Sequence, residues 1–279
     1  MKNSRTTPKT IISVIIPAFN EELYIDSCLS SLMKQQGCSD FEVIVVDNNS
    51  TDDTAKIVKK YPVELVFEKT PGVVKARQRG LSKAQGNIIV STDADCVFKP
   101  YWLANIEKFY IDNPQASGLA GHYYFYKSPL WALIFPTLGA VFVWIIYYVS
   151  GKTIYASATN LSFRKNTFDR GYDTKYFQGA DERGVVKEVS KRGRFHLTLK
   201  NPVYTSGRRV KQGFLHSIFV TIGYYYIYNV ISTTKNGTSS IGGHPVIRHE
   251  SKIHYLPVII FQWVMFVSVL IITWYILFK

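Results

Sequence analysis

The segment NIIVSTDADC, residues 87–96, is the strongest indication of the fold, because a short β-branched run ends directly in two aspartates, Asp93 and Asp95. A run of this kind predicts a buried strand. Three similar runs precede it, at residues 11–17, 41–47 and 63–67. Helical patterns fill the intervals, at residues 21–35, 50–60 and 72–85. This alternation predicts an α/β fold with a Rossmann-like, mainly parallel sheet and helices on both faces.

Polar residues gather where the predicted strands end. Asn20 and Glu21 follow the first strand, and Asp47 and Asn49 close the second. Ligands of parallel α/β sheets bind beyond the carboxyl ends of the strands, so we expect these side chains to converge on one site with the acids at 93–95. Asp47 could bind a nucleotide base or ribose. Asn49 could do the same or cap the next helix.

The pair Asp93 and Asp95, with one residue between them, predicts a divalent metal site. Mg²⁺ and Mn²⁺ prefer oxygen ligands and complete their shells with phosphates and water. A bound cation would neutralise the charge that builds up on a leaving diphosphate. The motif is short and common, and it gains weight here from the strand before it and from the acids at the neighbouring strand end.

A second acidic pair, Asp181 and Glu182, precedes a helical stretch that ends near Gly193. Either carboxylate could take a proton from an acceptor hydroxyl. The simpler explanation is that acids are favoured in the first turn of a helix. Arg77 lies on the predicted helix at 72–85, where it could contact a diphosphate or face solvent.

The composition narrows the partners. The chain has 279 residues, a formal net charge of +13 and 47 % hydrophobic residues. A basic chain can bind nucleic acid, anionic membranes or phosphorylated substrates. No nucleic-acid-binding motif is present, which leaves phosphates and lipid headgroups as the expected partners. The three cysteines lack the spacing of a zinc site or a disulfide framework, and we expect them to be reduced thiols, with Cys28 in the core.

The second half of the chain contains apolar stretches. Residues 256–278 carry no charge and are long enough to span a bilayer. Residues 130–150 are nearly as apolar. A single crossing there would separate the two acidic pairs, so we expect an interfacial or re-entrant helix pair bent near Pro136 and Gly139. A buried core helix is the alternative. We expect residues 214–231 to lie on the membrane surface.

These stretches predict four regions and a location. We expect a tail at 1–10, a catalytic domain at 11–210 that includes the apolar insert, a membrane-proximal region at 211–255 and the span at 256–278. The tail lacks the apolar core of a signal peptide. The prediction is therefore a cytoplasmic catalytic domain on the cell membrane with one C-terminal span.

Five blocks together carry a family resemblance: SVIIPAFNEE (13–22), EVIVVDNNSTDDT (42–54), GVVKARQRG (72–80), STDADC (91–96) and GADERGVVKEVSKRG (179–193). Their order and spacing resemble family 2 glycosyltransferases of the GT-A fold. The resemblance implies an inverting transferase that uses a nucleotide-sugar donor. It implies donor-binding roles for the following residues: Pro17, Ala18, Asn20, Glu21, Asp47, Asn49, Arg77, Asp93 and Ala94.

The same resemblance implies that Asp93 and Asp95 bind the metal and that the base lies at 181–182. Glu182 takes the base's position, although the family usually has Glu-Asp and Asp181 could act instead. Asn160 and Arg164 would face the acceptor. The Gln-x-x-Arg-Trp motif of processive members is absent, which favours transfer of one sugar per encounter.

The expected acceptor is a lipid-linked glycan or another glycolipid in the membrane. One alternative is a synthase that transfers a sugar directly to polyprenyl phosphate. A nucleotidyltransferase would need a glycine-rich basic loop after the first strand, and PAFNEE is not such a loop. The remaining alternative is a non-catalytic membrane scaffold, against which the intact acidic blocks argue.

Overall fold

Four parallel strands form the first half of the sheet. They are β1 (Ile11–Ala18), β2 (Asp40–Asp47), β3 (Glu64–Phe67) and β4 (Ile88–Ser91). They lie in the order β3-β2-β1-β4, with every neighbouring pair parallel. Their β-branched residues are buried on both faces of the sheet, as covered parallel strands require. All four predicted strands are confirmed.

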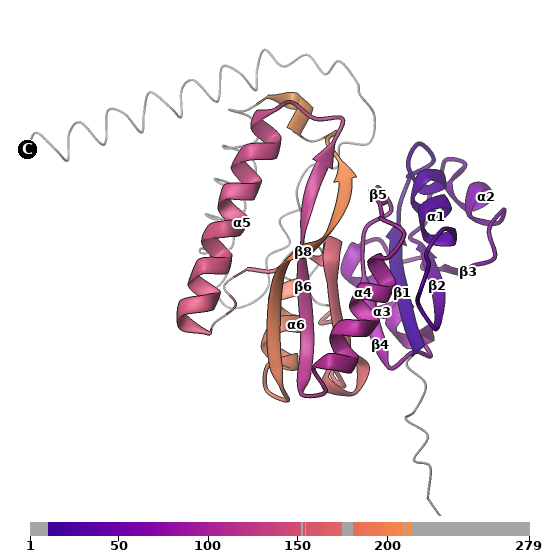
Figure 1. Cartoon of the computed structure of the whole chain (residues 1–279). Helices are drawn as coiled ribbons and strands as arrows, with labels where there is room; N and C mark the ends of the chain where they lie inside the picture. The colour runs from indigo at the N-terminus through magenta and orange to yellow at the C-terminus, as the bar shows by residue number, and fades with distance from the viewer. Residues whose placement is uncertain (1–10, 152, 154, 175–180, 209, 214–279) are drawn as a thin grey trace, which may run out of the picture. The chain divides into compact units, whose positions relative to one another are not determined.

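Helices cover both faces of this sheet, as predicted (Figure 1). The helices α1 (Ile25–Met33) and α4 (Trp102–Asp112) pack on one face, and α3 (Val73–Lys83) and α6 (Asp181–Val189) pack on the other. Cys28 is buried in α1, as expected. The helix α2 (Thr54–Val58) is shorter than predicted, because Thr51 and Asp53 bond to the loop after β1 through their backbone amides.

The second half of the sheet contains antiparallel strands as well, so the sheet is mixed, although most of its strands run in one direction as predicted. The strand β7 (Leu161–Arg164) lies antiparallel between β4 and β6 (Ala116–Tyr126). The strand β8 (Arg194–Ser206) runs parallel to β6, and the two-residue β5 (Cys96–Val97) pairs antiparallel with β8. Two 3-10 helices, η1 (Ala158–Asn160) and η2 (Lys165–Thr167), flank β7.

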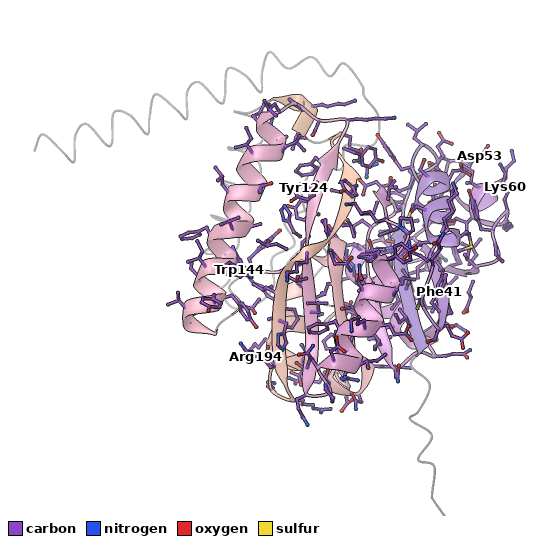
Figure 2. All side chains as sticks on the ribbon, in the orientation of Figure 1. Phe41, Asp53, Lys60, Tyr124, Trp144 and Arg194 are labelled. Carbon is purple, nitrogen blue, oxygen red and sulfur yellow. The ribbon has the colours of Figure 1, made fainter. Side chains whose placement is uncertain are left out.

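One continuous helix, α5 (Trp131–Ser150), replaces the bent pair that was expected. Pro136 removes one backbone donor, and the helix nevertheless continues through it. The helix packs on β6 and β8 and buries Ala132 and Tyr147. The Tyr147 ring lies 6.0 Å from the guanidinium of Arg194, which Figure 2 labels at the start of β8.

The outer side of α5 is apolar and exposed. Its large exposed side chains are the following: Leu133, Ile134, Leu138, Phe142, Trp144, Ile145, Tyr148 and Val149. Figure 2 labels one of them, Trp144. The helix carries no charged residue and has a mean hydropathy of 2.0. It is the one helix of the described part of the chain that is long and apolar enough to span a bilayer. Within the described part of the chain only 12 % of the most apolar window of α5 is buried, which does not fit the alternative of a buried core helix.

The computed structural model describes residues 11–151, 153, 155–174, 181–208 and 210–213. The contacts divide the chain into two compact units, with the division after Ser206. All the strands and α-helices above belong to the first unit. In the second unit the described residues include η3 (Val210–Gln212). The predicted membrane helices at 214–231 and 256–278 lie outside the described residues.

Candidate active site

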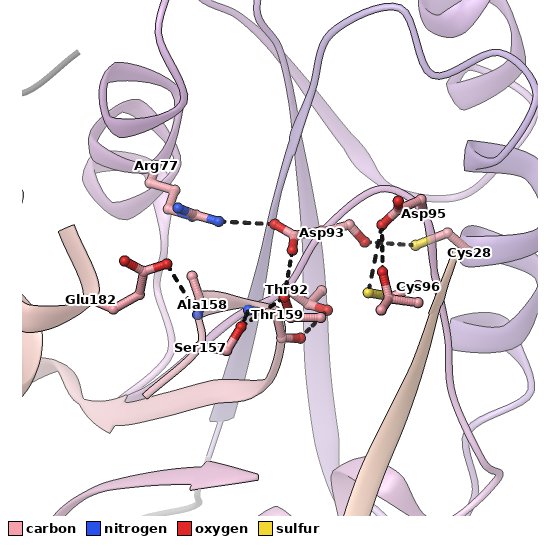
Figure 3. A network of polar contacts seen from close by, with 11 residues as sticks. Cys28, Arg77, Thr92, Asp93, Asp95, Cys96, Ser157, Ala158, Thr159 and Glu182 are labelled. Carbon is pink, nitrogen blue, oxygen red and sulfur yellow. Dashed lines mark hydrogen bonds and ion pairs between the residues drawn. The ribbon is translucent and has the colours of Figure 1, made fainter. Parts of the chain in front are cut away.

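Asp93 lies beyond the carboxyl end of β4, and a donor engages each of its carboxylate oxygens (Figure 3). Arg77 Nη2 donates to Oδ1 at 2.9 Å, and Thr159 Oγ1 donates to Oδ2 at 2.7 Å. The Arg77 side chain is only 5 % exposed, and that of Asp93 is 35 % exposed. Arg77 therefore faces the site from α3 rather than solvent.

Asp95 is attached to the other half of the sheet. Its Oδ1 accepts a hydrogen bond from Thr205 Oγ1 at 3.0 Å, and its backbone carbonyl accepts from Ser206 N at 3.2 Å. Both partners belong to β8. The two acids of the 93–95 motif are thus held by different parts of the fold, Asp93 by α3 and η1 and Asp95 by β8.

Ligand atoms of Asp93, Asp95 and Cys96 lie within 4.8 Å of one another. Burial raises the pKa of the Cys96 thiol well above its usual value, and the two nearby aspartates raise it further. The thiol is therefore neutral and a poor ligand for a hard cation. The carboxylate oxygens remain, and these are the ligands that Mg²⁺ and Mn²⁺ prefer. The residues present fit such an ion.

Glu182 approaches the same place from the first turn of α6. Its Oε1 accepts a hydrogen bond from the backbone amide of Ala158 at 3.4 Å. Ala158 precedes Thr159, which bonds to Asp93, so both acids contact the three-residue segment 157–159 (Figure 3). Asp181 begins α6, and its side chain lies outside the described part of the structure.

Two loops meet at the ends of β1 and β2, where donor-binding residues were expected. Ala18 pairs with Asp47 across the strands, and the buried Asp47 accepts from Ser50 N through Oδ1 at 3.0 Å. Asn20 Oδ1 accepts from Thr51 N at 2.7 Å. The predicted residues of these loops are therefore neighbours.

The remaining predicted donor residues lie close by. Asn49 and Asn20 both adopt positive φ angles, a conformation in which asparagine is enriched. The backbone carbonyl of Glu21 accepts hydrogen bonds from the backbone amides at the start of α1. Pro17 lies one residue inside β1, paired with Val46, and the buried Ala94 lies between the two aspartates.

Asn48 organises the next loop through its side chain. Its amide nitrogen donates to the carbonyls of Glu68 and Thr70, at 3.0 and 2.7 Å, and its Oδ1 accepts from Gly72 N at 2.8 Å. Gly72 has a φ of +130°, a conformation that side chains disfavour. These bonds fix the entry of α3 and hence the place of Arg77.

The expectation that Asn160 and Arg164 face the acceptor is wrong. Asn160 is buried and donates to the carbonyls of His122 and Asn201. Arg164 pairs with Ile88 at the start of β4, the end opposite Asp93, and donates to the carbonyls of Ala116 and Tyr110. Thr159, one position before Asn160, is the residue of this segment that reaches the site.

A cavity of about 640 Å³ lies at that opposite end of β4, lined by residues of α3, β7 and η2. Two of the polar side chains that line it already form hydrogen bonds with backbone atoms. Lys165 Nζ donates to Ala84 O at 2.5 Å, and Gln78 Oε1 accepts from Tyr172 N at 2.7 Å. The acids at 93–95 and Glu182 do not line it, so it is not the site described above.

Comparison with known proteins identifies the family. The model of "Glycosyl transferase family 2" matches residues 13–178, more than half of the chain. The chain belongs to glycosyl transferase family 2. The family 2 match begins within β1, continues beyond β7 and includes the acids at 93–95, whereas Glu182 lies beyond its end.

Individual relatives cover less of this glycosyltransferase chain. Glycosyltransferase AglE of Haloferax volcanii is 33 % identical over 105 residues, which cover 35 % of this chain and 34 % of that protein. The poly(ribitol-phosphate) β-N-acetylglucosaminyltransferase TarS of Staphylococcus aureus is 40 % identical over 90 residues, which cover 30 % of this chain and 16 % of TarS. The aligned part of this chain thus spans about a third or less of these relatives.

Among solved structures, the mannosyltransferase PcManGT from Pyrobaculum calidifontis, in complex with GDP-Man and Mn²⁺, is similar with a TM-score of 0.62. The two chains share 20 % identity, and the likeness covers 82 % of this chain and 65 % of PcManGT. It supports the mixed α/β sheet of GT-A type.

Proposed function

We propose that this chain transfers a sugar, with inversion, from a nucleotide-sugar donor to a membrane-associated acceptor. The observation that carries the proposal is the convergence of Arg77, Asp93 and Glu182 around segment 157–159. A buried cation, an acid of the predicted metal pair and an acid able to accept a proton occupy one site. That is the set of groups that sugar transfer from a diphosphate requires.

On the donor side, Asp47 and the loop of Asn49 would hold the nucleoside, and the guanidinium of Arg77 would favour the negative diphosphate. Asp95 and Asp93 would hold Mg²⁺ or Mn²⁺, which would stabilise the charge of the leaving diphosphate. The similar PcManGT was solved with GDP-Man and Mn²⁺, which supports this class of donor and metal.

On the acceptor side, Glu182 would take the proton of the attacking hydroxyl. The acceptor oxygen forms a bond to the anomeric carbon while the bond to the diphosphate breaks, so the nucleoside diphosphate leaves and the configuration inverts. We assign the base to Glu182 because its carboxylate is held at Ala158, next to the residue that holds Asp93.

The exposed apolar side of α5 supports a membrane-associated acceptor. Several large apolar side chains of one uncharged helix face outward, and such a surface is favourable in a lipid interface and costly in water. A lipid-linked glycan or another glycolipid would then reach the site from the bilayer. The alternative acceptor is polyprenyl phosphate itself. An acceptor panel distinguishes the two.

The test is a panel of nucleotide sugars and lipid acceptors assayed with the purified chain in detergent. We expect transfer with one donor, strict dependence on Mg²⁺ or Mn²⁺, and loss of activity in Asp95→Ala. The reacting acceptor distinguishes a lipid-linked glycan from polyprenyl phosphate. Transfer that continues without a metal ion, or in Asp95→Ala, would contradict the proposal.

A flotation experiment with anionic liposomes tests the membrane part separately. Leu138→Asp on α5 should reduce the bound fraction. Ile111→Asp on α4 is the matched control, since Leu138 is 59 % exposed and Ile111 is 62 % exposed. Equal binding of both variants and the wild type would show that α5 does not contact lipid.

A further inference from the structure

The carboxylate of Asp93 is held from two directions by side chains of different elements. Arg77 of α3 engages Oδ1, and Thr159 of η1 engages Oδ2. A carboxylate bound through one oxygen can still turn about its terminal bond, whereas donors on both oxygens fix its plane. The hydroxyl of Thr159 therefore limits how Asp93 can point.

The Thr159 hydroxyl belongs to a short chain of hydrogen bonds. Ser157 Oγ donates to Thr159 Oγ1 at 3.0 Å, and Thr159 Oγ1 donates onward to Asp93 at 2.7 Å. Each bond in such a chain polarises the next, which strengthens the last one. The chain ends on the ionised carboxylate, where a hydrogen bond is worth most.

The backbone of Thr159 is fixed independently of this hydroxyl. Its carbonyl accepts from Thr92 Oγ1 at 2.8 Å, next to Asp93 in the sequence. The segment therefore keeps its place through Thr92, and the hydroxyl contact with Asp93 acts on the orientation of that acid. Because Ala158 also binds Glu182, the same segment sets the position of Asp93 relative to Glu182.

We propose that Thr159 is a positioning residue for the donor site. Its hydroxyl orients the carboxylate of Asp93 for the metal and the diphosphate, and it keeps the position of Asp93 fixed relative to Glu182. This inference rests on the proposed function. It concerns a residue that does not itself bind the metal. Loss of the Thr159 hydroxyl should therefore weaken the affinity for the metal ion without removing any metal ligand.

The experiment compares Thr159→Val, which removes the hydroxyl at nearly constant volume, with Thr159→Ser, which retains it. The matched control is Thr167→Val. Thr167 is 7 % exposed against 9 % for Thr159, and its hydroxyl donates to the carbonyl of Arg164 at the far end of β7. The readouts are kcat, the Mn²⁺ concentration for half-maximal transfer, and the melting temperature.

We expect Thr159→Val to raise the half-maximal Mn²⁺ concentration about tenfold, as loss of a hydrogen bond to a charged group implies. Thr159→Ser and Thr167→Val should stay within about twofold of the wild type on the same scale. If Thr159→Val matches Thr167→Val, or if Thr159→Ser is as impaired as Thr159→Val, the positioning role is refuted.

The design separates this inference from the proposed function. If the wild type transfers no sugar from any donor, the proposed function fails, and the rise in melting temperature with Mn²⁺ then replaces activity as the readout. Thr159→Val should still reduce that rise while Thr167→Val does not. Should Thr159→Val fail to fold, Thr159→Ala measured against Thr159→Ser gives the same comparison, because neither enlarges the side chain.

Discussion

The two aspartates of the 93–95 motif have different electrostatic partners. Asp93 neutralises the buried guanidinium of Arg77, whereas Asp95 accepts from the neutral hydroxyl of Thr205. Removing the charge at position 93 takes away an ion-pair partner of this buried cation, and such losses are large. Substitutions of Asp93 and Asp95 should therefore differ in their effect on the free energy of unfolding, even if both abolish activity.

We predict that Asp93→Asn lowers the free energy of unfolding by about 1–3 kcal/mol. This is below the usual cost of breaking a buried pair, because the carboxylate is about one-third exposed. Asp95→Asn should cost less than Asp93→Asn, because its amide oxygen can still accept the hydrogen bond from Thr205. Urea unfolding measures both. Equal losses would mean that Arg77 does not depend on Asp93.

Glu182→Gln keeps the shape of the side chain and removes its ability to accept a proton. We predict that kcat falls by about 10²–10⁴-fold, the usual contribution of a general base. The affinity for the nucleotide sugar should change little, because the Asp93 and Asp47 contacts remain. Steady-state kinetics with calorimetric donor binding checks this. A nearly unchanged kcat would show that Glu182 is not the general base and would favour Asp181 instead.

At the scale of residues, the sequence predicted that Asp93, Asp95 and Arg77 lie close together, but it did not reveal the contact between Asp93 and Thr159. Asp93 and Asp95 follow directly from a strand that ends in a spaced acidic pair. Thr159 could not be recognised, because its contact with Asp93 depends on how β7 docks beside β4. Arg164 was misplaced because proximity in sequence to the site does not reveal which end of a strand a residue occupies.

At the scale of elements, α3 approaches the sheet closely at one position. A Cβ atom on Gly80 would lie 2.4 Å from Ile15 Cγ2 and 3.2 Å from Val46 Cγ2. Glycine in a helix normally costs stability relative to alanine, so its presence here indicates that the close packing of α3 on β1 and β2 requires it.

We predict that Gly80→Ala destabilises the protein by about 1–3 kcal/mol through overpacking. Gly184→Ala on α6 is the control, because a Cβ there meets no atom of the described residues within 4 Å. It should stabilise the protein by up to about 1 kcal/mol, as helix propensity implies. Denaturant unfolding of both variants measures the difference, and a stabilised Gly80→Ala would show that α3 can shift.

The strands β6 and β8 were not predicted, and their sequences explain why. Gly118 and Gly121 interrupt β6 and weaken any alternating pattern. In the structure these glycines mark close approaches, because Cβ atoms there would lie 2.6 Å from the Phe195 ring and 2.1 Å from the Asn160 amide. The helix α5 was recognised as apolar, but its continuity through Pro136 was not.

At the scale of the whole molecule, the buried imidazole of His122 and the half-buried imidazole of His196 make stability depend on pH. Burial lowers the pKa of His122, and burial together with the charge of Arg194 lowers the pKa of His196. The unfolded chain then binds protons more readily than the folded chain once the pH falls to about 6.5. The stabilising contribution is complete above that value and is lost as the pH falls toward the folded pKa.

We therefore predict a lower free energy of unfolding at pH 5 than at pH 7. The double variant His122→Asn with His196→Asn should show a weaker dependence over this interval. Urea unfolding at a series of pH values, at constant ionic strength, measures both. If the double variant loses stability on acidification as steeply as the wild type, other groups determine the dependence.

The position of β7 also governs when the protein becomes active during synthesis. Ser91 pairs with Leu161, seventy residues further along the chain, and closing so long a loop is slow and entropically costly. A nascent chain that has emerged only as far as α5 already contains the motif at 93–95, but neither Thr159 nor Glu182. The site can therefore be completed only after the ribosome has synthesised β7, the strand that joins the two halves of the sheet, and the residues that follow it.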